Sequence, residues 1–226
     1  MARSEFIKPD IAQYVEAHSG SPDEVQQSLQ TVTRERFGAR AGMQIGHDQA
    51  LLMEMLTRAM GVQAAVEIGT FTGYSALAVA RGLAPGGKLY CFDISDEWTS
   101  VGREHWKRAG VDDRIVLTLG PALESLAQLD PNLQFDLAFI DADKDNYAHY
   151  FEALLPRMRQ GALLLIDNTL WSGKVLDDAV GDADTVALRN LNNRLVADPR
   201  VLVVQLPLGD GVSVVQKLQL APTATG

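Results

Sequence analysis

The sequence predicts an α/β fold built on an open sheet of seven strands, mostly parallel, with helices on both faces. From residue 64 onward, short apolar runs alternate with stretches of helical length, which is typical of right-handed strand–helix–strand units. The end of the chain differs, because VLVVQLPLGDGVSVVQKL contains two strand-like runs joined by PLGDG. A connection that short can only form a hairpin, so the last strand is expected to run antiparallel in an otherwise parallel sheet.

The first 60 residues lack strand signals and are expected to form extra N-terminal helices, a lid or dimer segment on the core. Residues 10–36 are expected to be helical in two pieces broken at SGSPDE, where Ser21 can cap the second helix with Pro22 at its first position. GARAGMQIG is expected to be a loop, and residues 47–60 an amphipathic helix.

The core is expected over residues 61–218, and it belongs to one domain that spans residues 1–226. Its strands are recognised as short apolar runs that polar residues bound. They span residues 64–68, 88–93, 115–119, 135–140 and 162–166, followed by the two runs of the hairpin. The intervening helices span residues 74–81, 97–108, 122–128, 147–159 and 184–196. The tail, residues 219–226, is expected to be disordered.

Two of these strands end in clusters of polar residues. Residues 135–140 lead into Asp141 and Lys144, and residues 162–166 lead into Asp167 and Asn168. Ligands of open α/β sheets bind at the carboxyl ends of the strands. Carboxylates and an amide delivered to that edge suit Mg²⁺ or Ca²⁺. Lys144 is a candidate base, because burial and a nearby cation both lower an ammonium pKa.

The first strand leads into a glycine-containing turn, Gly69-Thr70-Phe71-Thr72-Gly73. Its G-x-x-x-G spacing differs from the G-x-G-x-x-G of dinucleotide binders, yet it still allows the backbone to approach a ligand closely. Asp93 ends the second strand, 24 residues past Gly69, where a carboxylate commonly binds ribose hydroxyls. Glu67 could meet a cationic group such as an α-ammonium. Alternatively, Glu67 and Asp93 only cap helix starts.

Several segments together resemble one known family. VEIGTFTGYSALAVA, CFDIS, GPALESL, FIDADKDNY, IDNTLWSGKV and PLGDG occur in this order. They resemble the cation-dependent class I S-adenosylmethionine O-methyltransferases, the group of caffeoyl-CoA and catechol O-methyltransferases, over about Met43 to Lys217. The resemblance implies a Rossmann-like fold, S-adenosylmethionine as cofactor, and a divalent cation (Mg²⁺, with Ca²⁺ or Mn²⁺ as alternatives). It also implies a catechol-type acceptor and a homodimer.

The resemblance also implies roles for individual residues. The implied metal ligands are Asp141, Asp167 and Asn168, and the implied catalytic residues are Lys144, as general base, and Asp141. The implied cofactor-binding residues are Met43, Ile45, Glu67, Gly69, Thr70, Ser75, Asp93, Ala122 and Asp141, with Asp93 at the ribose and Ala122 at the adenine. The sequence departs from the family pattern at Gly46 to Gln49, near the acceptor. Trp171 and Tyr147 could form walls around the acceptor ring or pack in the core.

Composition argues against other classes of function. The net charge is −9 and no basic run is present, which disfavours nucleic acid as a partner. No apolar run reaches the ~18 residues of a membrane helix, and the start of the chain lacks a secretory signal. The single cysteine, Cys91, fits a reducing cytoplasm.

Three alternatives to methyl transfer to a small molecule each conflict with a feature of the sequence. A tRNA-modifying methyltransferase conflicts with the acidic balance, and a nucleotide-binding oxidoreductase conflicts with the glycine spacing. An EF-hand at DADKDNYAHYFE lacks the glycine at its sixth position and follows a strand where a helix is required.

Overall fold

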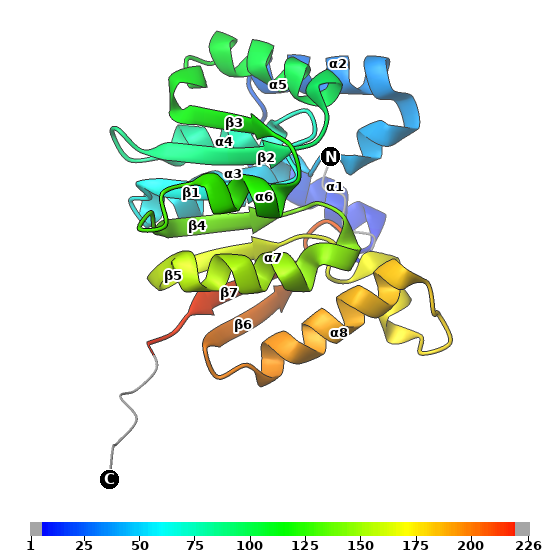
Figure 1. Cartoon of the computed structure of the whole chain (residues 1–226). Helices are drawn as coiled ribbons and strands as arrows, with labels where there is room; N and C mark the ends of the chain where they lie inside the picture. The colour runs from blue at the N-terminus through cyan, green and yellow to red at the C-terminus, as the bar shows by residue number, and fades with distance from the viewer. Residues whose placement is uncertain (1–5, 220–226) are drawn as a thin grey trace.

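Seven strands form one sheet in the order β3-β2-β1-β4-β5-β7-β6 (Figure 1). The structure is a computed structural model that describes residues 6–219, so the predicted disorder of the tail falls, Gln219 aside, outside the described residues. The strands are β1 (Ala64–Ile68), β2 (Lys88–Asp93), β3 (Ile115–Leu119), β4 (Phe135–Ile140), β5 (Met158–Ile166), β6 (Val201–Leu206) and β7 (Val212–Lys217). Strands β1 to β5 pair in parallel, and β7 pairs antiparallel with both β5 and β6. The predicted sheet and its antiparallel last strand are therefore confirmed.

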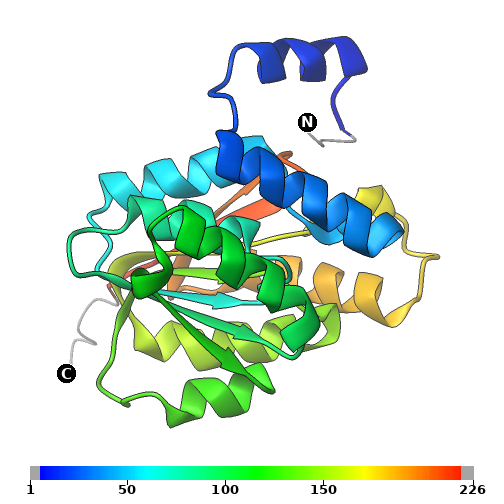
Figure 2. The same cartoon turned by 90° about the horizontal axis from the view of Figure 1, so that it is seen from above.

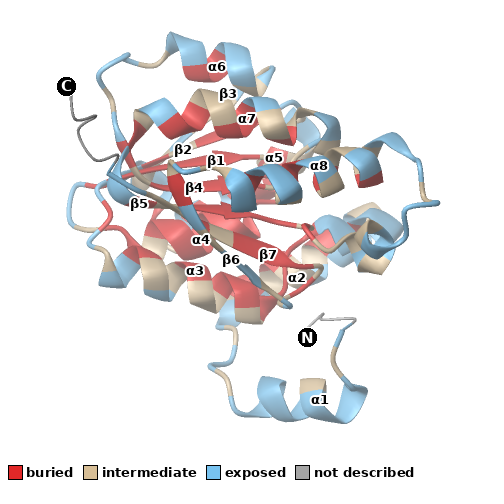
Figure 3. Ribbon diagram, turned by 90° about the horizontal axis from the view of Figure 1, so that it is seen from below, coloured by how far each residue is buried: buried red, intermediate tan, exposed pale blue. Residues whose placement is uncertain are grey.

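Helices cover both faces of the sheet (Figures 2 and 3). One face carries α3 (His47–Ala59), α4 (Tyr74–Gly82) and α5 (Asp96–Arg108), with α2 (Glu24–Phe37) packed outside α5. The other face carries α6 (Ala122–Gln128), α7 (Tyr147–Leu154) and α8 (Ala183–Ala197). The described N-terminal helix α1 (Pro9–Ala17) has no buried residue and stands away from the body. Within residues 6–219, no helix has both the length and the apolar character needed to span a bilayer.

Short 3₁₀ segments account for most differences from the prediction. GARAGM is not a loop but the segment η1 (Gly38–Met43), and others are η2 (Asp112–Arg114) and η3 (Lys144–Asn146). The helix expected to end at residue 159 ends at Leu154 and passes through η4 (Leu155–Arg157) into β5. Strand β5 thus begins earlier than its apolar run, and its first residues are mostly exposed. The segment η5 (Trp171–Leu176) was not predicted.

The cap of α2 also differs from the prediction. Asp23, rather than Ser21, caps this helix: its carboxylate accepts the Gln26 N–H at 2.9 Å while the Gln26 side chain accepts the Asp23 N–H at 3.1 Å. Such a capping box satisfies two otherwise unpaired donors, which explains why Asp23 is preferred over Ser21.

A buried polar network joins the N-terminal segment to the core. His47 Nε2 lies 2.9 Å from the carbonyl of Gly20, and His47 Nδ1 lies 2.9 Å from the Tyr74 hydroxyl, which accepts a bond from Gln30 at 3.0 Å. Because a carbonyl only accepts, Nε2 carries the proton and Nδ1 accepts from Tyr74. Burial lowers the pKa of His47, which favours this neutral form.

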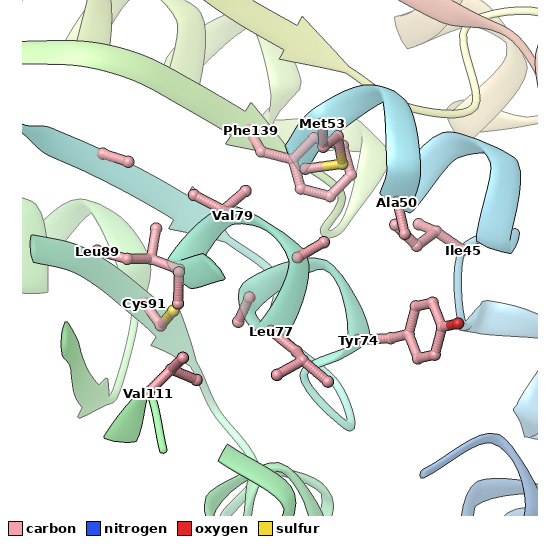
Figure 4. Close-up of a cluster of buried hydrophobic side chains, with 14 of the residues drawn as sticks. Ile45, Ala50, Met53, Tyr74, Leu77, Val79, Leu89, Cys91, Val111 and Phe139 are labelled. Atoms are coloured by element: carbon pink, nitrogen blue, oxygen red, sulfur yellow. The ribbon is translucent and has the colours of Figure 1, made fainter. Parts of the chain in front are cut away.

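The core consists of two apolar layers, one on each face of the sheet. Figure 4 shows the layer beneath α4, in which Leu77 and Val79 pack with Leu89 and Cys91 of the sheet. Cys91 is fully buried among these apolar side chains. This layer packs α4, the helix that follows the turn after β1, against the sheet.

Candidate functional site

The candidate site lies where the strand order of the sheet reverses. Strands β2 and β3 lie on one side of β1, whereas β4 and β5 lie on the other, so the connections diverge between β1 and β4. The backbone ladder continues past the strands, because the Asp141 N–H donates to Ile68 O (2.9 Å) and the Asp167 N–H donates to Ile140 O (3.0 Å). The ends of β1, β4 and β5 are therefore side by side, where open α/β sheets bind ligands.

Gly69 allows the ends of β1 and β4 to approach closely. A Cβ at this position would lie 1.9 Å from the carbonyl oxygen of Asp141, and the φ of Gly69 is +89°, a region that favours glycine. The turn then continues through Phe71 and Gly73, both with positive φ (50° and 74°). Only a chain with glycine at position 69 can bring the turn against Asp141 without a clash.

Asp93 organises the same turn from the end of β2. One of its carboxylate oxygens accepts the N–H groups of Thr70 (3.0 Å) and Phe71 (2.8 Å), and the other accepts the Ser95 N–H at 2.8 Å. Asp93 is 8% exposed. Asp93 thus organises the turn without capping a helix, since Gly73 and Ser95 are the N-caps of α4 and α5, and its Oδ1 retains capacity for a further donor.

Glu67 is fully buried below the turn, a position that sequence reasoning did not anticipate. Its Oε2 has no hydrogen-bond partner among the described residues, and its Oε1 lies 3.9 Å from the Cys91 sulfur. Burial raises the pKa of Glu67 to about 8, against the lowering influence of the Ser75 and Thr70 hydroxyls. At neutral pH the carboxyl group of Glu67 is therefore mostly protonated and uncharged beneath the turn.

Most of the predicted cofactor residues line one small pocket. Its lining includes Met43, Ile45, Gly69, Thr70, Ser75 and Asp141. Glu67, Asp93 and Ala122 are not part of this lining: Glu67 lies below it, Asp93 behind the turn, and Ala122 at the start of α6. The N-terminal segment closes the pocket, because the Gln44 amide donates to the hydroxyls of Thr33 (3.1 Å) and Thr72 (3.0 Å).

Two acidic side chains follow β4 and β5 and interact electrostatically. Asp167 is 4% exposed, and burial followed by the negative charge of Asp141 raises its pKa well above the usual range. The Asn168 N–H donates to the Asp167 carboxylate at 2.7 Å, and Asn168 has a left-handed φ of +58°. Within residues 6–219, no group of three His, Cys, Asp or Glu side chains is placed to hold a metal. The predicted ligand set has two carboxylates and an amide, and such hard oxygen donors fit Mg²⁺ or Ca²⁺. A bound cation would relieve the repulsion between the two carboxylates.

Lys144 lies against this pair at the start of η3. Its ammonium donates to Asp141 Oδ1 (3.1 Å), to the carbonyl of Ala142 (2.9 Å) and to the Tyr147 hydroxyl (2.7 Å). Its side chain is 11% exposed. All three N–H groups are thus directed by fixed acceptors, and the lysine faces the same edge as Asp141.

Two aromatic residues near Lys144 have different environments. Tyr147 is fully buried, so its ring packs in the core and only its hydroxyl reaches the site. Trp171 is partly exposed, and its ring lies 5.7 Å from Lys144 Nζ and 5.8 Å from Lys174 Nζ. Trp171 remains a candidate wall for an acceptor ring, whereas Tyr147 does not.

The rest of the DADKDNY motif serves the local fold. Asp143 accepts the Tyr150 hydroxyl at 2.6 Å, and Glu152 pairs with Arg194 and Arg200. The strand β4 precedes the motif, as predicted, where an EF-hand requires a helix.

Sequence reasoning missed the support that β6 and β7 give to this edge. The turn residues Asp210 and Gly211 accept backbone N–H groups of the loop after β5, and Ser213 of β7 contacts the fully buried Thr169 in this loop. The glycine–aspartate–glycine spacing in PLGDG was a signal, but it was interpreted only as a hairpin turn.

Comparisons with known proteins agree with this geometry. A family model described as O-methyltransferase matches residues 16–218. The chain is 40% identical over 189 residues to tricin synthase 1 of Oryza sativa subsp. japonica, covering 78% of this chain and 75% of that protein. It is 39% identical to catechol O-methyltransferase domain-containing protein 1 of Mus musculus, covering 76% and 66%. Among solved structures, an O-methyltransferase from Bacillus cereus in complex with SAH (S-adenosylhomocysteine) superposes with a TM-score of 0.83 at 29% identity, covering 92% of this chain and 97% of that one.

Proposed function

We propose metal-dependent methylation of a catechol-type hydroxyl for this chain, which belongs to the S-adenosylmethionine-dependent O-methyltransferases of the caffeoyl-CoA and catechol type. One observation carries the finer part of this proposal. Asp141, Asp167 and Asn168 follow adjacent strands, with Lys144 bonded to Asp141 and the glycine turn directly beside them.

The residues that would hold a divalent cation, Mg²⁺ in our proposal, are Asp141, Asp167 and Asn168. When bound, the cation would supply positions for two vicinal oxygens and lower the pKa of the hydroxyls it holds. The carboxylate of Asp167 is buried and that of Asp141 is partly exposed, and the repulsion between them favours a positive charge at this edge. Asn168 contributes an uncharged oxygen, so the site does not become excessively anionic.

The remaining residues bind, orient and move a proton. The turn from Gly69 and the residue Ser75 line the cofactor pocket, and Asp93 would accept a ribose hydroxyl at Oδ1, which accepts one N–H group. Lys144 Nζ, in its neutral form, would accept the proton of the acceptor hydroxyl and release it to solvent. S-adenosylmethionine, when bound, would supply the methyl group: the oxygen would bond to the methyl carbon while the carbon–sulfur bond of the sulfonium breaks, which would leave a thioether. Trp171 would shield one side of the acceptor ring from water.

We also propose a catechol-type acceptor, a homodimeric assembly and a cytoplasmic location for this protein. The name of the mouse relative contains the word catechol, and the proposed cation site suits two adjacent hydroxyls. A homodimer follows from the family resemblance. A cytoplasmic location fits the single, buried cysteine.

The test is release of S-adenosylhomocysteine, measured by mass spectrometry, from a pooled panel of catechols with Mg²⁺ or with EDTA. A matched panel of phenols that lack the second hydroxyl is the control. We expect turnover of the catechols only, lost in EDTA and restored by added Mg²⁺. Turnover that survives EDTA contradicts the metal proposal, and equal turnover of the simple phenols contradicts the catechol proposal.

Bulk tRNA is the second substrate to offer, because a tRNA-modifying methyltransferase was the main alternative. The net charge of −9 argues against broad phosphate contact. Methyl incorporation into tRNA without turnover of any catechol would replace the proposed acceptor class.

A further inference from the structure

The loop after β5 has an unusual backbone. Asn168, Trp171 and Ser172 have φ values of 58°, 49° and 51°, and Gly173 follows at 79°. Residues other than glycine rarely adopt this left-handed region, and they persist there only where the surrounding structure holds them. The contacts of this loop therefore determine whether its side chains keep their positions.

Four consecutive N–H groups of the loop, those of residues 169–172, donate to the turn between β6 and β7. The Thr169 N–H donates to the carbonyl of Gly211 (2.9 Å), and the next two N–H groups donate to the carbonyl of Asp210 (3.0 and 3.3 Å). The Ser172 N–H donates to the carboxylate of Asp210. Asp210 thus contacts the loop with its backbone and its side chain, and its carboxylate engages one of the strained residues.

The turn lies in direct contact with the loop. A Cβ at Gly211 would lie 2.5 Å from the Leu170 Cγ and 2.6 Å from the Leu170 nitrogen. Thr169 is anchored further, because its carbonyl accepts the Asn192 side chain at 2.7 Å and its hydroxyl lies 3.1 Å from the Ser213 hydroxyl. The carbonyl groups of Gly211 and Asp210 thus hold residues 169–171, and the carboxylate of Asp210 extends this contact to Ser172.

The loop carries two residues of the proposed site. Asn168, at its start, is a proposed cation ligand, and Trp171 faces the ammonium of Lys144. Trp171 directly precedes Ser172, whose N–H the Asp210 carboxylate accepts. Loss of this hydrogen bond therefore releases the residue that directly follows Trp171.

We propose that Asp210 is a positioning residue whose carboxylate holds the left-handed loop after β5, and through it Trp171 and Asn168, in the conformation that binds cation and acceptor. This inference rests on the proposed function for the identity of the ligands. The positioning of the loop by Asp210, by contrast, depends only on contacts within this chain. Asp210 acts through the loop, so its removal should leave the cofactor turn at Gly69 unaffected.

Two substitutions separate the hydrogen bond from the charge. Asp210→Ala removes both, whereas Asp210→Asn keeps an oxygen that can accept the Ser172 N–H but removes the charge. Asp130→Ala is the matched control, because the Asp130 carboxylate also accepts a backbone N–H in a turn, that of Asn132 at 2.9 Å, in the loop before β4. The full chain is used throughout.

Three measurements are made on each variant: fluorine NMR of fluorotryptophan-labelled protein, Mn²⁺ binding by electron paramagnetic resonance, and S-adenosylhomocysteine binding by calorimetry. The chain has three tryptophans, so Trp98 and Trp106 serve as internal controls, and a Trp171→Phe spectrum assigns the third signal. We expect Asp210→Ala to shift the Trp171 signal alone and to weaken Mn²⁺ binding about tenfold or more. Asp210→Asn and Asp130→Ala should stay near the wild type, and S-adenosylhomocysteine affinity should not change in any variant.

An unchanged Trp171 signal in Asp210→Ala overturns the proposal. So does a loss in Asp210→Asn as large as in Asp210→Ala, because charge rather than positioning would then be responsible. A shifted signal with unchanged Mn²⁺ affinity contradicts transmission to Asn168. If the wild type binds no Mn²⁺, the proposed cation site fails, and the Trp171 signal alone still decides whether Asp210 holds the loop.

Discussion

Lys144 donates a hydrogen bond of 2.7 Å to the hydroxyl of Tyr147, a residue whose ring is entirely buried in the core. Burial, and then the charges of Asp141 and Asp167, raise the pKa of Tyr147 well above its usual value, so the phenol stays protonated. The uncharged hydroxyl of Tyr147 thus orients Lys144, the proposed base, from its buried side. The ammonium is oriented by the fold rather than by its substrate.

Tyr147→Phe removes this partner without leaving a cavity. We expect kcat to fall about tenfold with little change in the KM for S-adenosylmethionine, because Lys144 loses one of three orienting contacts. Tyr150→Phe is the control, since its hydroxyl donates to Asp143 rather than to Lys144. Steady-state kinetics of both variants checks the prediction, and equal losses would show that any lost tyrosine hydroxyl on α7 has the same effect.

Asp167→Asn should separate cation binding from cofactor binding. The variant keeps its shape but loses the negative charge, so Mn²⁺ binding and metal-dependent turnover should disappear while S-adenosylhomocysteine binds normally. It should also melt at a higher temperature than the wild type without added cation, because the buried repulsion with Asp141 is gone. Asp143→Asn, in the same motif, is the control. Normal turnover by Asp167→Asn would remove Asp167 from the metal site.

Asp93→Ala should weaken cofactor binding with little effect on Mn²⁺ affinity. Its carboxylate accepts three backbone N–H groups, so stability should also fall, by about 1–3 kcal/mol. Asp136→Ala is a close control, because Asp136 accepts the N–H groups of Gln63 (2.8 Å) and Ala64 (3.0 Å) at the opposite end of β1. Calorimetry and thermal melts should show two destabilised proteins, of which only Asp93→Ala has lost affinity for S-adenosylhomocysteine.

Glu67 should make stability fall as the pH rises. Its pKa is raised from 4.5 to about 8, so between these values the native state holds a proton that the unfolded state releases. The stabilising contribution is complete below pH 4.5 and is lost as the pH rises through 8. Glu67→Gln remains neutral, so its melting temperature should decrease less over this interval, by several degrees. Melting curves across the interval, with exposed Glu97→Gln as control, test this; parallel curves for Glu67→Gln and wild type would contradict it.

Elements whose signals are local were predicted well from the sequence. Strands such as β2 and β4 match their apolar runs, because polar residues bound a buried strand on both sides. The predicted edge at Asp141 and Asp167 followed from the same signals. Strand β5 was predicted too short, because its first residues, MRQG, have the composition of a surface loop while still continuing the strand.

What the sequence did not predict depends on distant contacts. The left-handed conformation of Trp171 and Ser172 is fixed by Asp210, about 40 residues later in the chain, and no local pattern encodes it. The burial of Glu67 likewise depends on packing against β2 and α4 rather than on its neighbours. The site residues could be predicted from sequence motifs, whereas the residues that hold them in place could not.

The order of the strands has a consequence for the emerging polypeptide. Strand β7 is inserted between β5 and β6, and the turn that precedes it holds the loop after β5. During synthesis, the glycine turn, Asp93 and both acidic strand ends leave the ribosome before this turn exists. The loop after β5 therefore gains these contacts only when the final strand enters the sheet. The proposed acceptor site can thus be complete only after β7 has been translated.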